Sequence, residues 1–146
     1  MANVIPFSFR GALFSAQHDF ATSGNTFKFA LYSATPYDTS STVYSTTSEQ
    51  SSAGGSNYDA GGNALTTQAV ASGTAVASCD FANTEWTSAT ITAAYGAIYN
   101  SSTVDSLANR LCVVLDFSGS KSCTNGTFTI SFPDPSTPAD AIISMA

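Results

Sequence analysis

Charged side chains are scarce in this sequence, and cations are the scarcest. Only 10 % of the 146 residues are Asp, Glu, Lys or Arg, against about a quarter in typical soluble domains. The net charge is −6, and the four cationic residues are scattered at Arg10, Lys28, Arg110 and Lys121. A nucleic-acid site needs several clustered Lys or Arg side chains to contact phosphates. The composition therefore excludes nucleic acid as a partner.

Long hydrophobic runs are also missing. No apolar run approaches the roughly 20 residues that a membrane-spanning helix needs, so we expect no membrane association. The N-terminal stretch MANVIPFSFRGALF has no basic region followed by an apolar one. We therefore expect no signal peptide and synthesis in the cytoplasm.

Cysteines are few, and their spacing does not suggest a metal site. Cys79, Cys112 and Cys123 form no CxxC pair, so we expect no zinc site. Cys79 and Cys112 lie in apolar runs and are predicted to be buried free thiols. Cys123 follows a polar break and is predicted to be more exposed, with an intermolecular disulfide as the alternative.

Catalytic patterns are absent, and we therefore predict that the protein is not an enzyme. His18 is the only histidine and no GxSxG motif accompanies it, so a surface position at a helix end is expected. Asp80 and Glu85 flank Trp86 in the way that a sugar-cleaving carboxylate pair would. The simpler interpretation places Asp80 on the solvent face of a strand, Glu85 in a turn and Trp86 in the core.

One oxygen-rich cluster deserves comparison with a calcium site. Asn57, Asp59 and Asn63 lie in a Gly-rich stretch but lack the DxDxDG spacing. Asn and Asp are also the residues that form turns. We interpret the cluster as turn structure and expect no metal and no cofactor.

What the sequence does have is alternation with period two, which is typical of half-buried strands. The stretch from Thr90 to Phe132 contains three such runs, and we predict three consecutive antiparallel strands there. They comprise Ile91–Tyr99, Leu111–Phe117 and Thr127–Phe132. A fourth strand is predicted from Thr26 to Ser33, with Phe27, Phe29 and Leu31 facing inward.

The remaining elements are shorter. Apolar residues at helical spacing predict a helix from Phe9 to His18, begun by Pro6 and capped by Ser8, with a strand from Ile5 to Leu13 as the alternative. Two further strands are predicted at Ala64–Val70 and Ala75–Phe81.

A long Ser/Gly-rich loop, residues 35–62, lies between the predicted strands Thr26–Ser33 and Ala64–Val70. It is too long for an ordinary connection. We expect it to run over the surface, with one helical turn near residues 42–48 and with Tyr37, Tyr44 and Tyr58 as anchors. Because exposed loops carry binding contacts, these three tyrosines are candidate partner contacts.

Both ends of the chain are predicted to be arms, over residues 1–6 and 133–146. The apolar run Ala139–Met145 contains Ile142, Ile143 and Met145, which are three further candidate contacts. This run is predicted to add a strand at a sheet edge of its own chain or of a neighbouring chain. In total, one domain spans residues 1–146, and the fold class is all-β. It is an antiparallel β-sandwich, for which a jelly roll is one possible topology, with one short N-terminal helix.

The order of these segments resembles small virion proteins of tailed bacteriophages. The resemblance runs through TFKFALYSA, SNYDAGGNAL, FANTEWTSATITAAYGAIYN and RLCVVLDFSGSKSCTNGTFTISF, and its most specific parts are Tyr58–Leu65, Glu85–Tyr99 and Leu115–Phe132. The Ser-rich insertion Thr39–Ser52 and the spacing of Phe117, Ser118 and Gly119 depart from that pattern.

The resemblance implies a non-enzymatic structural role in the virion. The expected role is a capsid decoration or cement protein on the capsid surface, made in the host cytoplasm, that binds the major capsid protein and other copies of itself. The alternative is a tail or fibre component that binds a host glycan or receptor. In that case the tyrosine-rich loop and Trp86, with Tyr95 and Tyr99, would form the binding platform.

Overall fold

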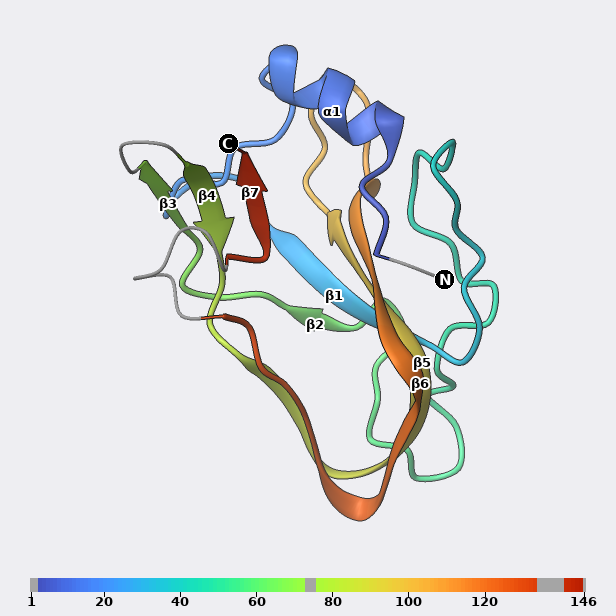
Figure 1. The fold of residues 1–146 in the computed structure, drawn as a ribbon. Coiled ribbons are helices and arrows are strands. Elements are labelled where there is room, and N and C mark those ends of the chain that lie inside the picture. The colour runs from blue at the N-terminus through green and yellow to red at the C-terminus, as the bar shows by residue number, and fades with distance from the viewer. Residues whose placement is uncertain (1–2, 73–75, 134–140, 146) are drawn as a thin grey trace.

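A computed structural model describes residues 3–72, 76–133 and 141–145. Seven strands form two antiparallel sheets, and one short helix lies across their common end (Figure 1). The four-stranded sheet has the order β2-β1-β5-β6, and the three-stranded sheet has the order β3-β4-β7. The predicted all-β, sandwich-like fold with a single short helix is confirmed. No helix of the described residues is long and apolar enough to cross a membrane.

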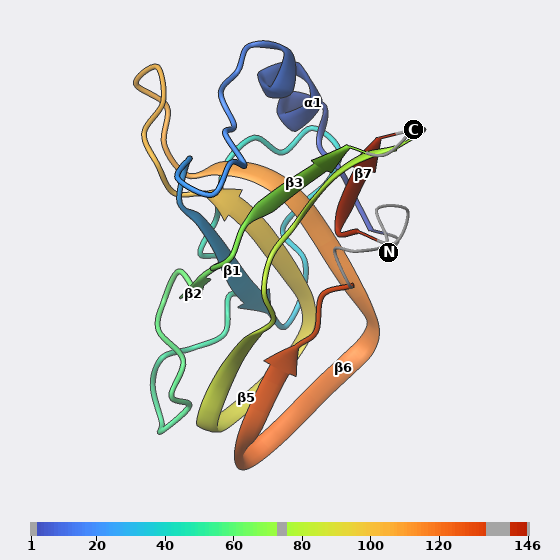
Figure 2. The same cartoon turned by 90° about the vertical axis from the view of Figure 1, so that its left-hand side faces the viewer.

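Two very long strands dominate the four-stranded sheet. Strand β5 (Thr84–Asn100) pairs with β6 (Arg110–Ile130) along nearly its whole length, from the pair Thr84–Ile130 to the pair Asn100–Arg110. Figure 2 shows the two strands running side by side around a bend. We call this unit the β5–β6 ribbon.

The prediction of three strands between Thr90 and Phe132 is therefore wrong in one respect. Leu111–Phe117 and Thr127–Phe132 do not form separate strands, because the first and most of the second lie on the single strand β6. The polar residues between them were interpreted as a turn, but they form the bend. The pairing there shifts register several times, and Ser88, Ser118 and Asn125 have positive φ. Such irregularities bend a strand without ending it.

The bend divides the ribbon into a near half, which contains Trp86, and a far half, which contains Tyr95–Asn100. The near half packs over the core face of the far half. Strand β1 (Phe27–Tyr32) pairs with the far half of β5, from Tyr95 to Asn100. On one face of β1, Phe27, Phe29 and Leu31 are fully buried, as predicted. They belong to a core that also contains Trp86 of the ribbon's near half, so the interpretation of Trp86 as a core residue is confirmed.

The second face of β1 is buried as well. Ala30 and Tyr32 are fully buried in a smaller cluster with Tyr37, Tyr99 and Leu111. The long loop covers this face with Tyr37 and Tyr44, which pack in or against the cluster. It also pairs along the edge of β1, since the Gln50 N–H bonds the Leu31 carbonyl at 2.8 Å. The loop has a turn at Thr46–Glu49 and no helix, so the predicted helical turn at residues 42–48 is wrong.

The helix α1 (Phe7–Phe14) is shorter than predicted and starts earlier. Ser8 does not cap it, because its hydroxyl bonds the Ser41 carbonyl at 2.9 Å and Pro6 occupies the cap position. The helix ends before Ala16, which has φ 53°. The alternative of a strand from Ile5 to Leu13 is wrong.

The short strands also differ from expectation. The predicted strand Ala64–Val70 is two strands: β2 (Asn63–Ala64) pairs with β1, and β3 (Ala69–Ser72) pairs with β4 (Ala77–Asp80). The break falls near Thr67, which has φ 54°. Strand β7 (Ile143–Met145) pairs with β4, so the last predicted strand lies at a sheet edge of its own chain. Residues 139 and 140 of that prediction, Ala75, and residues 1, 2, 134–140 and 146 of the two arms lie outside the described residues.

Two glycines of the long loop, Gly55 and Gly62, allow a test of how closely this loop must approach β1. Gly62 (φ +71°) lies so close to β1 that an added Cβ would be 1.9 Å from the Phe29 carbonyl oxygen, whereas Gly55 (φ +73°) has nothing within 4 Å of that position. Gly55→Ala should cost about 1 kcal/mol, the penalty of a left-handed residue. Gly62→Ala should cost clearly more, because the backbone must also move. Urea unfolding of both variants measures this, and equal losses would contradict the packing of the loop on β1.

Candidate functional site

The side chains that the sequence proposes as partner contacts are found in two different environments. Tyr37 and Tyr58 are buried, with exposed fractions of 4 % and 1 %. Tyr44 is partly buried. Tyr37 and Tyr58 therefore point into the protein as core residues, and a role of the loop tyrosines as partner contacts stays a prediction. The loop composition suggested an exposed segment because it is rich in Ser and Gly.

Glu49 is the centre of this tyrosine cluster. The hydroxyls of Tyr44 and Tyr58 both donate to its carboxylate, the latter at 2.7 Å, and the Gly61 N–H donates at 2.7 Å. Tyr44 also stacks on Tyr99 with ring centroids 4.5 Å apart. Burial, reinforced by the Glu49 carboxylate, raises the pKa of both the Tyr44 and the Tyr99 hydroxyls. The pKa of Tyr99 rises to about 12. These phenols therefore remain neutral donors, and the cluster fastens the loop to the sheet.

His18 is buried, and the expectation of a surface position is wrong. Its exposed fraction is 7 %, and its ring lies between those of Phe9 and Phe27 at centroid distances of 4.9 and 6.4 Å. Asn100 Nδ2 lies 3.2 Å from His18 Nδ1, and because an amide nitrogen can only donate, a hydrogen bond between the two needs Nδ1 as the acceptor. Burial and then the nearby Arg110 guanidinium lower the pKa of His18 to about 4.

The two carboxylates beside Trp86 do not form a pair on one surface. Asp80 is buried, with an exposed fraction of 2 %, and its Oδ1 accepts from the Phe81 N–H at 2.8 Å. Glu85 is exposed and lies within β5. The predicted positions, a solvent-facing Asp80 and a Glu85 in a turn, are both wrong.

The cysteines follow the prediction for free thiols. Cys79 and Cys112 are buried and Cys123 is half-buried, and all three are free. Burial raises the pKa of Cys79 to about 12 and that of Cys112 well above its usual value. Cys123 lies in β6 at the bend of the ribbon, and its Sγ contacts the Ala89 carbonyl at 3.2 Å.

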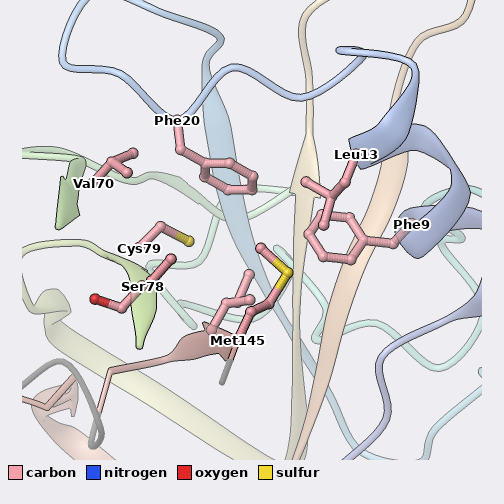
Figure 3. A pocket seen from close by; sticks show the side chains of 9 residues that line it. Phe9, Leu13, Phe20, Val70, Ser78, Cys79 and Met145 are labelled. Carbon is pink, nitrogen blue, oxygen red and sulfur yellow. The ribbon is translucent and has the colours of Figure 1, made fainter. Parts of the chain in front are cut away.

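The other predicted contacts border three hollows at the surface. Ile142 borders a hollow of about 490 Å³ along β6, with Phe132 and Asp116 among its neighbours. Ile143 and Met145 of β7 border two adjoining hollows of about 100 and about 400 Å³, which Phe9 and Leu13 of α1 also border. We call these two adjoining hollows the α1–β7 groove, and Figure 3 shows its inner part.

Several exposed apolar side chains surround the α1–β7 groove. Phe14 is 94 % exposed, Val70 60 % and Met145 58 %, and each borders the groove. Contiguous apolar surface of this kind marks a binding site more often than scattered single residues do. The groove is therefore the best candidate for a functional surface among the described residues.

Phe14 and Val70 were missed by sequence reasoning. Phe7 and Phe14 are seven residues apart in a helix whose inward positions are Phe9 and Ala12. That spacing places both phenylalanines on the opposite face, and it was a readable signal. Val70 had no such signal, because a single apolar residue in a short strand is equally compatible with burial.

The three residues of the oxygen-rich cluster lie in a loop and a strand, because Asn57 and Asp59 belong to the long loop and Asn63 belongs to β2. Asn57 has φ 52° and its amide bonds the Thr87 carbonyl, while the Gly62 N–H bonds the Asp59 carbonyl at 2.9 Å. The Asn63 amide bonds the Glu85 carbonyl at 2.9 Å. Within the described ranges, no group of three or more His, Cys, Asp or Glu side chains is placed to hold a metal ion.

Comparison of the chain with models of protein families, with curated proteins and with solved structures finds no match.

The buried His18 should make stability depend on pH. Because its folded pKa is below the unfolded value of 6.5, the unfolded state binds the extra proton between pH 6.5 and pH 4, so stability falls as pH falls through that window. The loss should reach about 3 kcal/mol at pH 4. Chemical denaturation at several pH values should show this loss in the wild type and a flatter profile in His18→Gln. Parallel profiles would contradict a neutral buried imidazole.

Removing the acceptor at the centre of the tyrosine cluster should loosen the long loop. Glu49→Ala should cost about 2 kcal/mol, since hydrogen bonds to a charged group are among the stronger ones. Hydrogen exchange should accelerate at Tyr44 and Gly61 more than in β5. Glu85→Ala is the matched control, because Glu85 is an exposed glutamate and its removal should change neither. Equal effects of the two substitutions would refute the role of Glu49.

Proposed function

We propose that the protein is a non-enzymatic structural component of a tailed-phage virion. In this proposal it is a decoration or cement protein on the capsid surface that binds the major capsid protein and associates with its own copies. The observation that carries the proposal is the ordered series of sequence motifs that resembles small virion proteins, above all Tyr58–Leu65, Glu85–Tyr99 and Leu115–Phe132.

The packing of these three motifs supports the proposal. Tyr58 lies against Trp86 with ring centroids 5.7 Å apart, and Trp86 lies against Phe128 at 6.3 Å. One aromatic side chain from each motif thus contributes to a single contact series in the core. The motifs are consequently parts of one structural unit, which is what a shared fold would preserve.

The surface chemistry is also compatible with cementing. A decoration protein stabilises a lattice through many small contacts between subunits. Hydroxyl-rich surfaces can make such contacts without the cost of removing charges from water. The apolar side chains around the α1–β7 groove offer a stronger contact region, and a net charge of −6 disfavours adhesion to packaged DNA.

The alternative of a glycan-binding tail or fibre module has less support. That alternative requires Trp86 and the loop tyrosines to form an aromatic binding platform. Trp86, Tyr37 and Tyr58 have exposed fractions of 4 %, 4 % and 1 %. A sugar stacks on an exposed ring face, and these three side chains offer little of one.

The proposal can be tested on purified virions separated into heads and tails. We expect quantitative mass spectrometry to find the protein in the head fraction, at a copy number that matches lattice positions. Heads that lack the protein should release DNA at a lower temperature, and adding the purified protein should restore the original temperature. Detection only in tails would contradict the capsid location, and absence from both fractions would contradict any virion role.

A further inference from the structure

Among the residues that the structure describes, strand β7 has a strand partner on only one side. The three-stranded sheet has the order β3-β4-β7, so β7 pairs with β4 and forms the outer edge. In an antiparallel ladder, the backbone groups of alternate residues point to opposite sides of the strand. Some N–H and C=O groups of β7 therefore point away from β4 and are available to a further strand.

The hollow of about 400 Å³, which we call the outer part of the α1–β7 groove, runs along this edge of β7. Three consecutive residues of β7 border it, Ile143, Ser144 and Met145. Side chains of consecutive strand residues point to opposite faces, so a hollow that reaches all three follows the edge of the strand and not one face. Leu13 and Phe14 of α1 form the opposite wall, together with Phe9. An extended chain placed here would have backbone on one side and apolar side chains on the other.

Nothing on β7 protects this edge. Proteins usually block an exposed strand edge with a charge, a proline or a covering segment. Strand β7 contains neither a charge nor a proline. The outer edge of β6, by contrast, is partly covered, because Val114 pairs with Val4 and Arg110 pairs with Val43.

Charge indicates what kind of segment would fit. Of the described residues that border the outer groove, Arg10 is the one with a charge. Its guanidinium donates to the Ile5 carbonyl at 3.1 Å and lies 5.0 Å from the centre of the Phe7 ring. Neither contact is with a carboxylate of the described part of the chain. A carboxylate on an incoming segment would give this cation an opposite charge in a largely apolar groove.

We propose that the α1–β7 groove binds an extended segment of another protein, which joins the free edge of β7 as an additional strand. The segment places apolar side chains against Leu13, Phe14 and Met145 and carries a carboxylate that meets Arg10. A second copy of this chain fits less well through β7 itself, because Ile143–Met145 has no acidic residue. The inference goes beyond the virion role and does not depend on it, since it concerns only the chemistry of the bound segment.

The test uses the full chain and a displayed library of random decapeptides. We expect selection on the immobilised protein to enrich peptides with alternating apolar residues and at least one Asp or Glu. Binding of an enriched peptide should shift the backbone amide resonances of Ile143, Ser144 and Met145. It should weaken at least tenfold in Arg10→Glu and by a smaller factor in Arg10→Gln.

Two controls separate this mode of binding from general stickiness. Lys121→Glu changes the net charge by the same amount at an exposed site on β6 and should leave affinity within twofold. Replacing the peptide's acidic residue by Lys should restore binding to Arg10→Glu. Because Arg10 is exposed on α1, its variants should melt at the wild-type temperature.

Four outcomes would overturn the proposal. They are failure to enrich any such peptide, binding that Arg10→Glu leaves unchanged, amide shifts confined to other strands, and concentration-dependent self-association that shifts the same three amides.

Discussion

The structure depends on the continuous pairing of β5 with β6 through the bend of the ribbon. Because the two strands remain paired from Thr84–Ile130 to Asn100–Arg110, one ribbon supplies both the sheet that holds β1 and the layer that packs over it. Gly96 of β5 shows how closely β1 side chains lie on this sheet: an added Cβ would lie 2.3 Å from the Phe29 ring on the neighbouring strand. The remaining elements add side chains to the same core, including Phe9 of α1, Cys79 of β4 and Ile143 of β7. The helix, the long loop and the small sheet are positioned by the faces and ends of the ribbon.

Two polar sites connect those peripheral elements to the ribbon. Glu49 joins Tyr58 and Gly61 of the long loop to each other, and the Tyr99 hydroxyl of β5 ties this group to the ribbon by donating to the Gly61 carbonyl at 2.8 Å. His18 connects the segment after α1 to Asn100 at the end of β5. Both sites bury polar groups, and a buried polar group stabilises a fold only while it keeps its partner and its charge state. The end of the molecule that carries the α1–β7 groove therefore depends on the imidazole remaining neutral.

Period-two patterning was sufficient to predict the fold class and the inward face of β1, because burial on a sheet imposes that period directly. It failed at residues 118–126, where Ser, Gly and Asn are equally suited to a turn and to a bulge. It also failed for Tyr37 and Tyr58. A Ser- and Gly-rich loop looks exposed, but the second face of β1 needed a cover, and only tertiary structure reveals that need. The groove was half predicted: Ile143 and Met145 were named from the apolar C-terminal run, whereas the helix face opposite them was not.

The most direct test of the continuous ribbon is a set of cross-strand proton contacts measured by NMR. If β6 is one strand paired with β5 throughout, backbone contacts should appear both between Trp86 and Phe128 and between Tyr95 and Asp116, which are paired on either side of the bend. Backbone contacts between residues 111–117 and residues 127–132 should be absent. The opposite result, with those two segments paired to each other as a hairpin, would contradict the ribbon and everything that is positioned by it.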